Sequence, residues 1–234
     1  MIIGSGLLAK AFEPRHASSE HTWIYAAGVS NSGCTDPKEF EREKLRLSEA
    51  LHAGMAADAF VYFSTCSVAD PKSARSPYVL HKKAMEGIVR THPRYLVARL
   101  PQVAGRTPNP HTLLNYLYAR ISRSEAFPVW VRATRNIIDV EDVARIVDAL
   151  LAEPSRRCTT VNVANPVSHP IMEIVAAMEK SVGKEAVTRL VDDGAPYEID
   201  TSEIGPIVER LGLCFDGDYL LKIARKYYAR GALP

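Results

Sequence analysis

Short apolar runs alternate with helical patterns over the first half of the chain. A brief apolar stretch opens it at Met1–Ile3, and three longer runs read as parallel strands buried on both faces: 22–28 (TWIYAAG), 58–65 (DAFVYFST) and 94–101 (RYLVARLP). Helical patterns lie between these runs, at 7–12, at 37–53 and from residue 77 onward. Strand–helix alternation of this kind predicts an α/β fold with a Rossmann-like, doubly wound parallel sheet.

The second half has fewer strand patterns and more proline. A helical pattern at 111–121 follows the proline-rich TPNP, and short strand patterns follow at 127–131 and 135–140. In the next segment, 140–153, the apolar residues fall on one helix face, as expected for a helix packed on a sheet: Val143, Ile146, Val147, Leu150 and Leu151. A last strand pattern at 159–164 and an amphipathic helix at 169–183 complete this part.

No linker divides the chain, so we expect a single domain, 1–234. Residues 1–102 and 136–164 would form a shortened Rossmann-like core. Residues 103–135 and 165–234 would form a small substrate-binding lobe over the carboxyl edge of the sheet, where ligands bind in such folds.

Composition narrows the class of protein. The net charge of +2 gives no sign of a nucleic-acid partner. No apolar run approaches the ~18 residues of a membrane span, and Met1 leads straight into a strand, which does not resemble a signal peptide. The cysteines lack metal-ligand spacing, so we expect no metal site and reduced thiols in a cytoplasmic enzyme: Cys34, Cys66, Cys158 and Cys214.

A glycine turn follows the first strand. Gly4, Gly6 and Ala9 fit the pattern G-x-G-x-x-(G/A) between a strand and a helix. There the glycines allow a tight turn and a close approach of the backbone to a pyrophosphate, which the helix N-terminus binds. The alternative is a plain strand–turn–helix unit with no ligand.

The acidic residue of a full dinucleotide site is missing downstream. Such a site places a carboxylate about 20 residues on, at the end of the next strand, to hold the adenosine ribose. Here the next strand ends in Ala26-Ala27-Gly28, and the nearby Glu13 and Glu20 are better explained as solvated loop residues. We infer that a strand–helix–strand unit of the adenine half is absent.

A tyrosine and a lysine lie one turn apart at the start of the third predicted helix. Ser76 is a good N-cap and Pro77 a good first helical residue, which places Tyr78 in the first turn and Lys82 on the same face. The helix dipole and the ammonium would both favour a phenolate, and lowering a phenol pKa from ~10 towards neutrality requires roughly 4 kcal/mol. Taken alone, the pair also fits two ordinary residues on a solvated helix face.

These motifs form an ordered set that resembles a known family. GSGLLA, YAAG, STCSV, YVLHK, RLPQVAG and RNIIDVEDVARIV occur in this order, and TVNVANPVSHPIMEIV and TSEIGPIVERLGL extend the similarity to the C-terminal part. The sequence resembles the extended short-chain dehydrogenase/reductase family, in particular the NAD-dependent nucleotide-sugar epimerases and dehydratases of bacterial surface-polysaccharide synthesis. The resemblance implies NAD or NADP as cofactor and a nucleotide-linked sugar as substrate.

The resemblance also implies roles for individual residues. Tyr78 would be the general acid/base at a sugar hydroxyl, Lys82 would hold the nicotinamide ribose and lower the phenol pKa, and Thr65 would hydrogen-bond the substrate oxygen. Besides Tyr78 and Lys82, the implied cofactor-binding residues are Gly4, Ser5, Gly6, Leu7, Leu8, Ala26, Ala27, Gly28, Pro101 and Val103. The implied substrate-binding residues are Thr65, Cys66, Ser67, Gln102, Arg106, Asn109 and Arg135, of which Arg135 fits a surface arginine beside a turn equally well.

Departures from the family pattern bear on the reaction. Dehydratases carry an aspartate–glutamate pair after the threonine, whereas Cys66 and Ser67 stand here, which argues against dehydration; Cys66 also fits a small buried filler. The leading hypothesis is a nucleotide-sugar epimerase. The alternatives are a 4-keto-sugar reductase, and a non-catalytic relative that binds a nucleotide or sugar nucleotide with weakened cofactor binding.

The resemblance further predicts a homodimer. Family members pack the helix after YAAG and the tyrosine helix against their symmetry mates. In this sequence the predicted partner face on residues 39–53 consists of Phe40, Leu45, Leu47 and Leu51.

Overall fold

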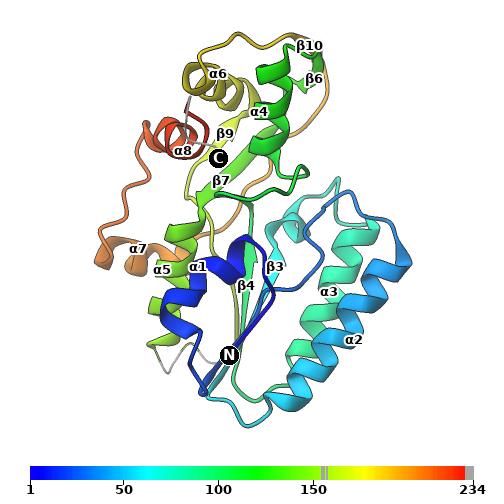
Figure 1. Ribbon diagram of the computed structural model, residues 1–234, viewed down its shortest axis with the longest axis vertical. Helices are drawn as coiled ribbons and strands as arrows, with labels where there is room; N and C mark the ends of the chain where they lie inside the picture. The colour runs from blue at the N-terminus through cyan, green and yellow to red at the C-terminus, as the bar shows by residue number, and fades with distance from the viewer. Residues whose placement is uncertain (154–155, 157, 230–234) are drawn as a thin grey trace.

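A computed structural model describes residues 1–153, 156 and 158–229 of the 234-residue chain. Parts of the predicted core and lobe ranges, namely 154–155, 157 and 230–234, lie outside them. The fold is α/β and Rossmann-like, as predicted, with a parallel sheet at its centre (Figure 1). The order of its five strands is β1 (Ile2–Ile3), β2 (Thr22–Tyr25), β3 (Ala59–Thr65), β4 (Tyr95–Leu100) and β8 (Thr159–Asn162).

Helices cover both faces of this sheet. In Figure 1, α2 (Pro37–Ala53) and α3 (Pro77–Val89) lie on one side, and α1 (Leu7–His16), α5 (Val140–Leu151) and α7 (Gly205–Arg210) lie on the other. Apolar side chains fill both layers between helices and sheet. The predicted start of α2 is confirmed, because the Asp36 carboxylate accepts a hydrogen bond from the Lys38 N–H at 2.9 Å.

The first strand lies at the edge of the sheet. It has two residues and pairs in parallel with β2, with Ile2 opposite Ile24. The chain passes from α1 directly into β2, which is the second strand of the sheet in both sequence and space. The sheet therefore ends at the strand that carries the glycine turn.

The lobe stands over the carboxyl edge of the sheet (Figure 1). Its helices α4 (Leu113–Arg123), α6 (Ile171–Val182) and α8 (Tyr219–Tyr228) share one apolar cluster. Two small sheets accompany them, one of β6 (Phe127–Trp130) and β10 (Thr188–Val191), the other of β5 (Gln102–Ala104), β7 (Thr134–Asp139) and β9 (Ser168–Pro170). Two 3₁₀ turns, η1 (Cys66–Ala69) and η3 (Ser202–Ile204), complete the described elements.

A buried aspartate joins the lobe to the sheet. Asp139, the N-cap of α5, accepts hydrogen bonds from the Tyr227 hydroxyl at 2.7 Å and the Lys226 ammonium at 2.9 Å. Both donors come from α8, at the far end of the described chain. The contact anchors the lobe beside the carboxyl edge of the sheet, where the site is found.

The outer face of α2 and α3 differs from the predicted partner face. Leu47 and Leu51 are 0% and 3% exposed in the core beneath α2, so their assignment to a partner face was wrong. Leu45 of α2, which was also assigned to that face, is 56% exposed, and Leu80 of α3, which was not named, is 54% exposed. Among the described helices, none is both long and apolar enough to cross a membrane.

Candidate active site

A cavity of about 670 Å³ lies between the carboxyl edge of the sheet and the lobe. Its wall on the sheet side comes from the glycine turn after β1, the ends of β2 and β3, and the first turns of α3. Residues 100–112 close it from the lobe side together with Tyr197. Because such a cavity at the carboxyl ends of parallel strands is where α/β folds bind ligands, it is the candidate site.

The structure brings most of the predicted site residues to this cavity. Seventeen of them line it: Gly4, Ser5, Gly6, Leu7, Leu8, Ala26, Ala27, Gly28, Thr65, Ser67, Tyr78, Lys82, Pro101, Gln102, Val103, Arg106 and Asn109. Two do not lie on its wall. The Cys66 thiol is buried and donates to the Arg99 carbonyl at 3.2 Å, and the Arg135 guanidinium donates to the carbonyl of Thr134.

The glycine turn has the shape of a phosphate cradle. Gly4 has φ +136°, and a Cβ there would stand 2.5 Å from the Ala26 carbonyl oxygen, so this position requires glycine. A Cβ on Gly6 would meet nothing within 4 Å, and no side chain caps the first N–H groups of α1. Open space over free N–H groups at a helix N-terminus suits an anion, so the turn fits a pyrophosphate.

The tyrosine of the predicted pair is almost fully buried at the cavity wall. The Ser76 hydroxyl accepts a hydrogen bond from the Val79 N–H at 3.3 Å, which starts α3 and holds Tyr78 in its first turn. Burial, and secondly the charge of Glu43, raise the pKa of the Tyr78 phenol, while a hydrogen bond with the Thr65 side chain acts in the opposite direction. Contrary to the sequence prediction, the phenol pKa in the free protein lies above its ordinary value.

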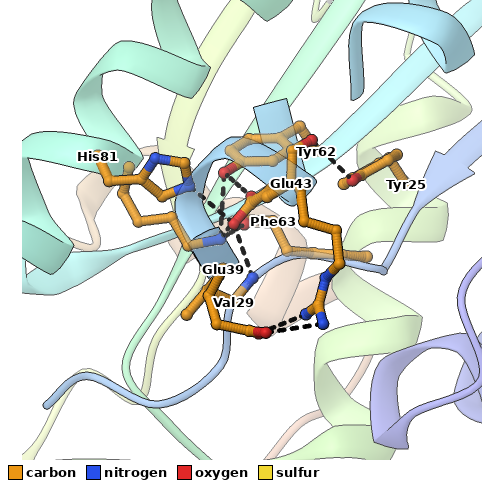
Figure 2. Close-up of polar contacts among 9 residues, drawn as sticks. Tyr25, Val29, Glu39, Glu43, Tyr62, Phe63 and His81 are labelled. Atoms are coloured by element: carbon orange, nitrogen blue, oxygen red, sulfur yellow. Dashed lines mark hydrogen bonds and ion pairs between the residues drawn. The ribbon is translucent and has the colours of Figure 1, made fainter. Parts of the chain in front are cut away.

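Lys82 gives all three of its ammonium hydrogens to protein acceptors. Its Nζ lies 3.1 Å from the Glu43 carboxylate, 3.1 Å from the Tyr62 hydroxyl and 3.4 Å from the Phe63 carbonyl (Figure 2). Burial lowers the pKa of Lys82, and the charge of Glu43 opposes that effect. A ribose hydroxyl bound by Lys82 would therefore have to replace one of these acceptors, of which the Phe63 carbonyl is the most distant.

Glu43 of α2 is the centre of this network, and it was not among the predicted residues. One of its carboxylate oxygens accepts from the Tyr62 hydroxyl at 2.7 Å and from Lys82, and the other from the Val29 N–H at 2.7 Å and His81 Nε2 at 2.9 Å (Figure 2). Burial alone would raise the pKa of Glu43. Donors such as His81 and the charge of Lys82 outweigh it and hold that pKa at about 2.

Glu43 could have been noticed from its position in the sequence. It follows Phe40 by three residues and precedes Leu47 by four, so the three share one face of a helix. That face is the buried one, with Glu43 and Leu47 at 1% and 0% exposure. A glutamate on the apolar stripe of an amphipathic helix signals a buried partner of opposite charge.

Basic side chains outnumber acidic ones on the cavity wall. Its basic residues are Lys10, Arg46, Lys82 and Arg106, and the described residues of the wall include no aspartate or glutamate. Sequence reasoning missed Lys10, Arg46 and Tyr197, since single residues of these types on helices and loops carry no motif. This charge balance favours an anionic ligand.

Thr112 contributes a polar atom without a partner to the lobe side of the cavity. It is the N-cap residue of α4, but its side chain makes no capping hydrogen bond. Its Oγ1 is buried and, in the described structure, has no hydrogen-bond partner. Buried hydroxyls are usually paired, so this atom is suited to a bound ligand.

The sheet order, the glycine turn and the tyrosine–lysine helix together define a dinucleotide-binding fold of the short-chain dehydrogenase/reductase type. The model of the NAD dependent epimerase/dehydratase family matches residues 21–164, more than half of the chain. The chain belongs to this family. No curated protein matches it.

Solved structures of this type share the whole fold. RMD from Pseudomonas aeruginosa, complexed with NADPH, has a TM-score of 0.73 at 16% identity, covering 96% of this chain and 95% of that chain. UDP-glucuronic acid 4-epimerase from Bacillus cereus, in complex with UDP-glucuronic acid and NAD, has a TM-score of 0.73 at 18% identity, covering 94% and 76%. WbmH from Bordetella bronchiseptica, in complex with NAD+, has a TM-score of 0.67 at 18% identity, covering 96% and 79%. At these identities the likeness shows the fold.

Proposed function

We propose that this protein is an NAD(P)-dependent enzyme acting on a nucleotide-linked sugar, most simply an epimerase, with Tyr78 as its acid/base. One observation carries the proposal: Tyr78, Thr65 and the open glycine turn line the same cation-rich cavity. A phenol with a hydroxyl neighbour supplies proton transfer, and the turn supplies an anion site at a fixed place beside it. Family membership supports the same assignment.

The cofactor would be NAD or NADP. Gly4, Ser5 and Gly6 would hold its pyrophosphate on the first N–H groups of α1, and the remaining cofactor residues would be Leu7, Leu8, Ala26, Ala27, Gly28, Tyr78, Lys82, Pro101 and Val103. When bound, a nicotinamide accepts or donates a hydride. Solved structures with this fold contain NAD+ or NADPH, which supports the choice of cofactor.

Within this cavity the chain's own groups would handle the proton. Tyr78 would take the proton from a sugar hydroxyl or return it, and Thr65 would fix the sugar oxygen beside the phenol. The Thr65 oxygen already accepts a hydrogen bond from the Ser67 N–H at 3.1 Å, which orients its own hydrogen towards another acceptor. Lys82 would lie beside the phenol, with its charge paired to Glu43.

The sugar nucleotide would occupy the lobe side of the cavity. Arg106 would face its diphosphate, and the polar groups that line this side would bind its hydroxyls: Ser67, Gln102, Asn109 and Thr112. Arg135 and Cys66 are not needed, since neither lies on the wall. We place the reaction in the cytoplasm and in bacterial surface-polysaccharide synthesis, where sugar nucleotides are the building blocks.

A ketone reductase is the second candidate, favoured by the Glu43–Lys82 contact. An epimerase that starts from a hydroxyl needs Tyr78 as a base, whereas a reductase needs it as an acid. The carboxylate beside Lys82 raises the pKa of Tyr78, which suits the acid. A non-catalytic sugar-nucleotide-binding protein is the third candidate, because the sheet ends at β1.

Cofactor titration separates the enzymes from the non-catalytic protein. NADH and NADPH are titrated into the protein, with and without UDP-sugars, while nicotinamide fluorescence is followed. Saturable binding with an emission change is expected, and it should disappear when Gly4 is replaced by valine. No binding at millimolar cofactor would contradict the proposed function, and conversion of UDP-sugars monitored by chromatography would then be the deciding assay.

We also propose a homodimer formed through α2 and α3. Leu45 and Leu80 give their outer face two large exposed apolar side chains, which supports a partner surface. A second copy related by two-fold symmetry would cover both residues at once.

A further inference from the structure

Two opposite charges are buried next to the phenol of the site. The side chains of Glu43 and Lys82 are 1% and 4% exposed, and their charged atoms lie 3.1 Å apart. A Cβ on Gly28 would stand 2.7 Å from both Glu43 Oε1 and Lys82 Nζ, and Gly28 itself lines the cavity. The ion pair therefore lies directly beneath the cavity wall.

The position of the ion pair limits how strongly the charge of Lys82 can stabilise the ionised form of Tyr78. The ammonium lies 6.0 Å from the centre of the Tyr78 ring, about twice its distance from the Glu43 carboxylate. Because the carboxylate lies next to the ammonium, its negative potential at the phenol opposes the positive potential of the ammonium. A lysine in this setting has lost much of its power to stabilise a phenolate.

Other polar and charged side chains surround the Glu43–Lys82 ion pair. Tyr62 of β3 donates its hydroxyl to Glu43 and accepts from Lys82, and the ring of His81 meets the second Glu43 oxygen. Glu86 adds a further carboxylate near Lys82, but it is paired with Arg99 at 2.7 Å and with Arg90 at 3.3 Å. Glu43 is the carboxylate in direct contact with the Lys82 ammonium.

We propose that Glu43 is a positioning residue: it holds Lys82 in the cavity wall by neutralising its charge and, together with burial, favours the protonated form of Tyr78 in the free enzyme, so that the site is set to donate a proton to a ketone. This inference rests on the second candidate of the proposed function, the ketone reductase, and deepens it, since it names a keto sugar nucleotide as the substrate class bound first. The direction in which burial and Glu43 move the pKa of Tyr78 agrees with it.

The chemistry of the step balances with the groups named. Reduction of a ketone adds a hydride to the carbonyl carbon and a proton to the oxygen. The hydride comes from a reduced nicotinamide cofactor, which becomes oxidised, and the proton comes from the Tyr78 phenol, whose phenolate is later reprotonated from solvent. A phenol that begins the cycle ionised would have no proton to give.

Direct titration of Tyr78 tests the inference without cofactor or substrate. The ultraviolet absorbance of phenolate is followed against pH in the full protein and in its Tyr78→Phe variant, and the difference gives the Tyr78 midpoint. The same pair of curves is measured in a Glu43→Gln background. We expect Glu43→Gln to move the midpoint down by about one pH unit or more, and Glu43→Asp to leave it nearly in place. An unchanged or higher midpoint in Glu43→Gln would overturn the inference.

Two further variants serve as controls, which distinguish loss of the Glu43 charge from disruption of the fold. Glu86→Gln removes an equally buried carboxylate near Lys82 and should leave the Tyr78 midpoint nearly unchanged, since Glu43 is the carboxylate that acts on Tyr78. The double variant Glu43→Gln/Lys82→Met leaves no unpaired charge, and its midpoint should stay within about half a pH unit of the parent's. A rise of more than one unit there would mean that Lys82 acts on Tyr78 without compensation, and would also overturn the inference.

An activity measurement then addresses the substrate class. The rate with a 4-keto sugar nucleotide and NADPH is divided by the rate with a UDP-sugar and NADP+ at the same pH. We expect this ratio to exceed one and to fall about tenfold in Glu43→Gln, which corresponds to one pH unit. A ratio below one in the parent protein would reject the keto substrate while leaving the Tyr78 titration intact. Absence of both activities, with the predicted titration, would reject the proposed function alone.

Discussion

Gly28 and Glu43 fit together with no space between them. A Cβ on Gly28 would stand 2.7 Å from Oε1 of Glu43 and equally close to Nζ of Lys82. These are ends of side chains, but both are buried and held by several hydrogen bonds, so they cannot move aside freely. The glycine at the end of YAAG thus serves the ion pair as well as the cavity.

Replacing Gly28 by alanine is therefore expected to destabilise the protein. The added methyl group would displace the ion pair, at a cost of about 1–3 kcal/mol in the free energy of unfolding. Chemical denaturation measures it. The matched control is Gly87→Ala in α3, where a Cβ meets nothing within 4 Å and should stabilise the helix by about 0.5–1 kcal/mol. Equal effects at both positions would contradict the packing described here.

From the lowered pKa of Glu43 we predict how the stability of the protein depends on pH. Its folded pKa of about 2 lies below its unfolded value of 4.5, so the unfolded chain binds the proton more readily between these values. The stabilisation, about 3 kcal/mol, is complete above pH 4.5 and is lost as the pH falls towards 2. Denaturation curves between pH 2 and 6 should be less steep in their pH dependence for Glu43→Gln than for the parent. If the free energy of unfolding of Glu43→Gln depends on pH as steeply as that of the parent protein, the ionised Glu43 does not make this contribution.

Tyr78→Phe tests the acid/base role. Loss of the hydroxyl should lower kcat about 10²–10⁴-fold and leave cofactor affinity nearly unchanged, because the ring that lines the cavity remains. Steady-state kinetics and fluorescence titration measure the two effects. Tyr118→Phe on α4, outside the wall of this cavity, is the control and should have neither effect. Full activity of Tyr78→Phe would remove Tyr78 from the chemistry.

Thr112→Val tests the substrate side. Since Oγ1 of Thr112 has no partner in the described structure, valine should change the free energy of unfolding by less than about 0.5 kcal/mol. If the hydroxyl binds substrate, KM for the sugar nucleotide should rise about fivefold to tenfold, with kcat little changed. Thr112→Ser keeps the hydroxyl and should retain most of the affinity. An unchanged KM in the valine variant would place Thr112 outside the substrate site.

A charged substitution tests the proposed dimer surface. Leu80→Arg places a cation in the centre of the proposed α2–α3 face and should convert a dimer into a monomer, measured by light scattering at high concentration. Leu190→Arg on β10 is the control, because Leu190 is 62% exposed and lies in the lobe. A parent protein that is monomeric at high concentration would refute the proposal directly.

The sequence predicted the sheet and its helices because their signals are local. Continuous apolar runs correspond to β2, β3 and β4, and the Ser76 cap and the helical pattern from residue 37 correspond to the starts of α3 and α2. The small strands β5, β9 and β10 were not predicted, since their sequences, QVA, SHP and TRLV, contain no apolar run longer than two residues and no clear alternation. Their pairing depends on partners distant in sequence.

The motifs predicted which residues form the site, but they did not predict the charged groups around those residues. Motif residues such as Tyr78 and Lys82 do line the cavity, but nothing local to YVLHK shows that a carboxylate from α2 reaches the lysine. The sign of the effect on the phenol pKa therefore came out opposite. Such a charge balance depends on tertiary contacts between helices, and only a fold brings them together.

The short edge strand has a consequence for the behaviour of the protein in concentrated solution. A sheet that stops early presents an open row of backbone groups, which commonly recruits strands from other molecules. Here β1 offers only two residues for such recruitment. Because it is too short to pair with a strand of another molecule over any length, this edge of the sheet resists fibril-like self-association.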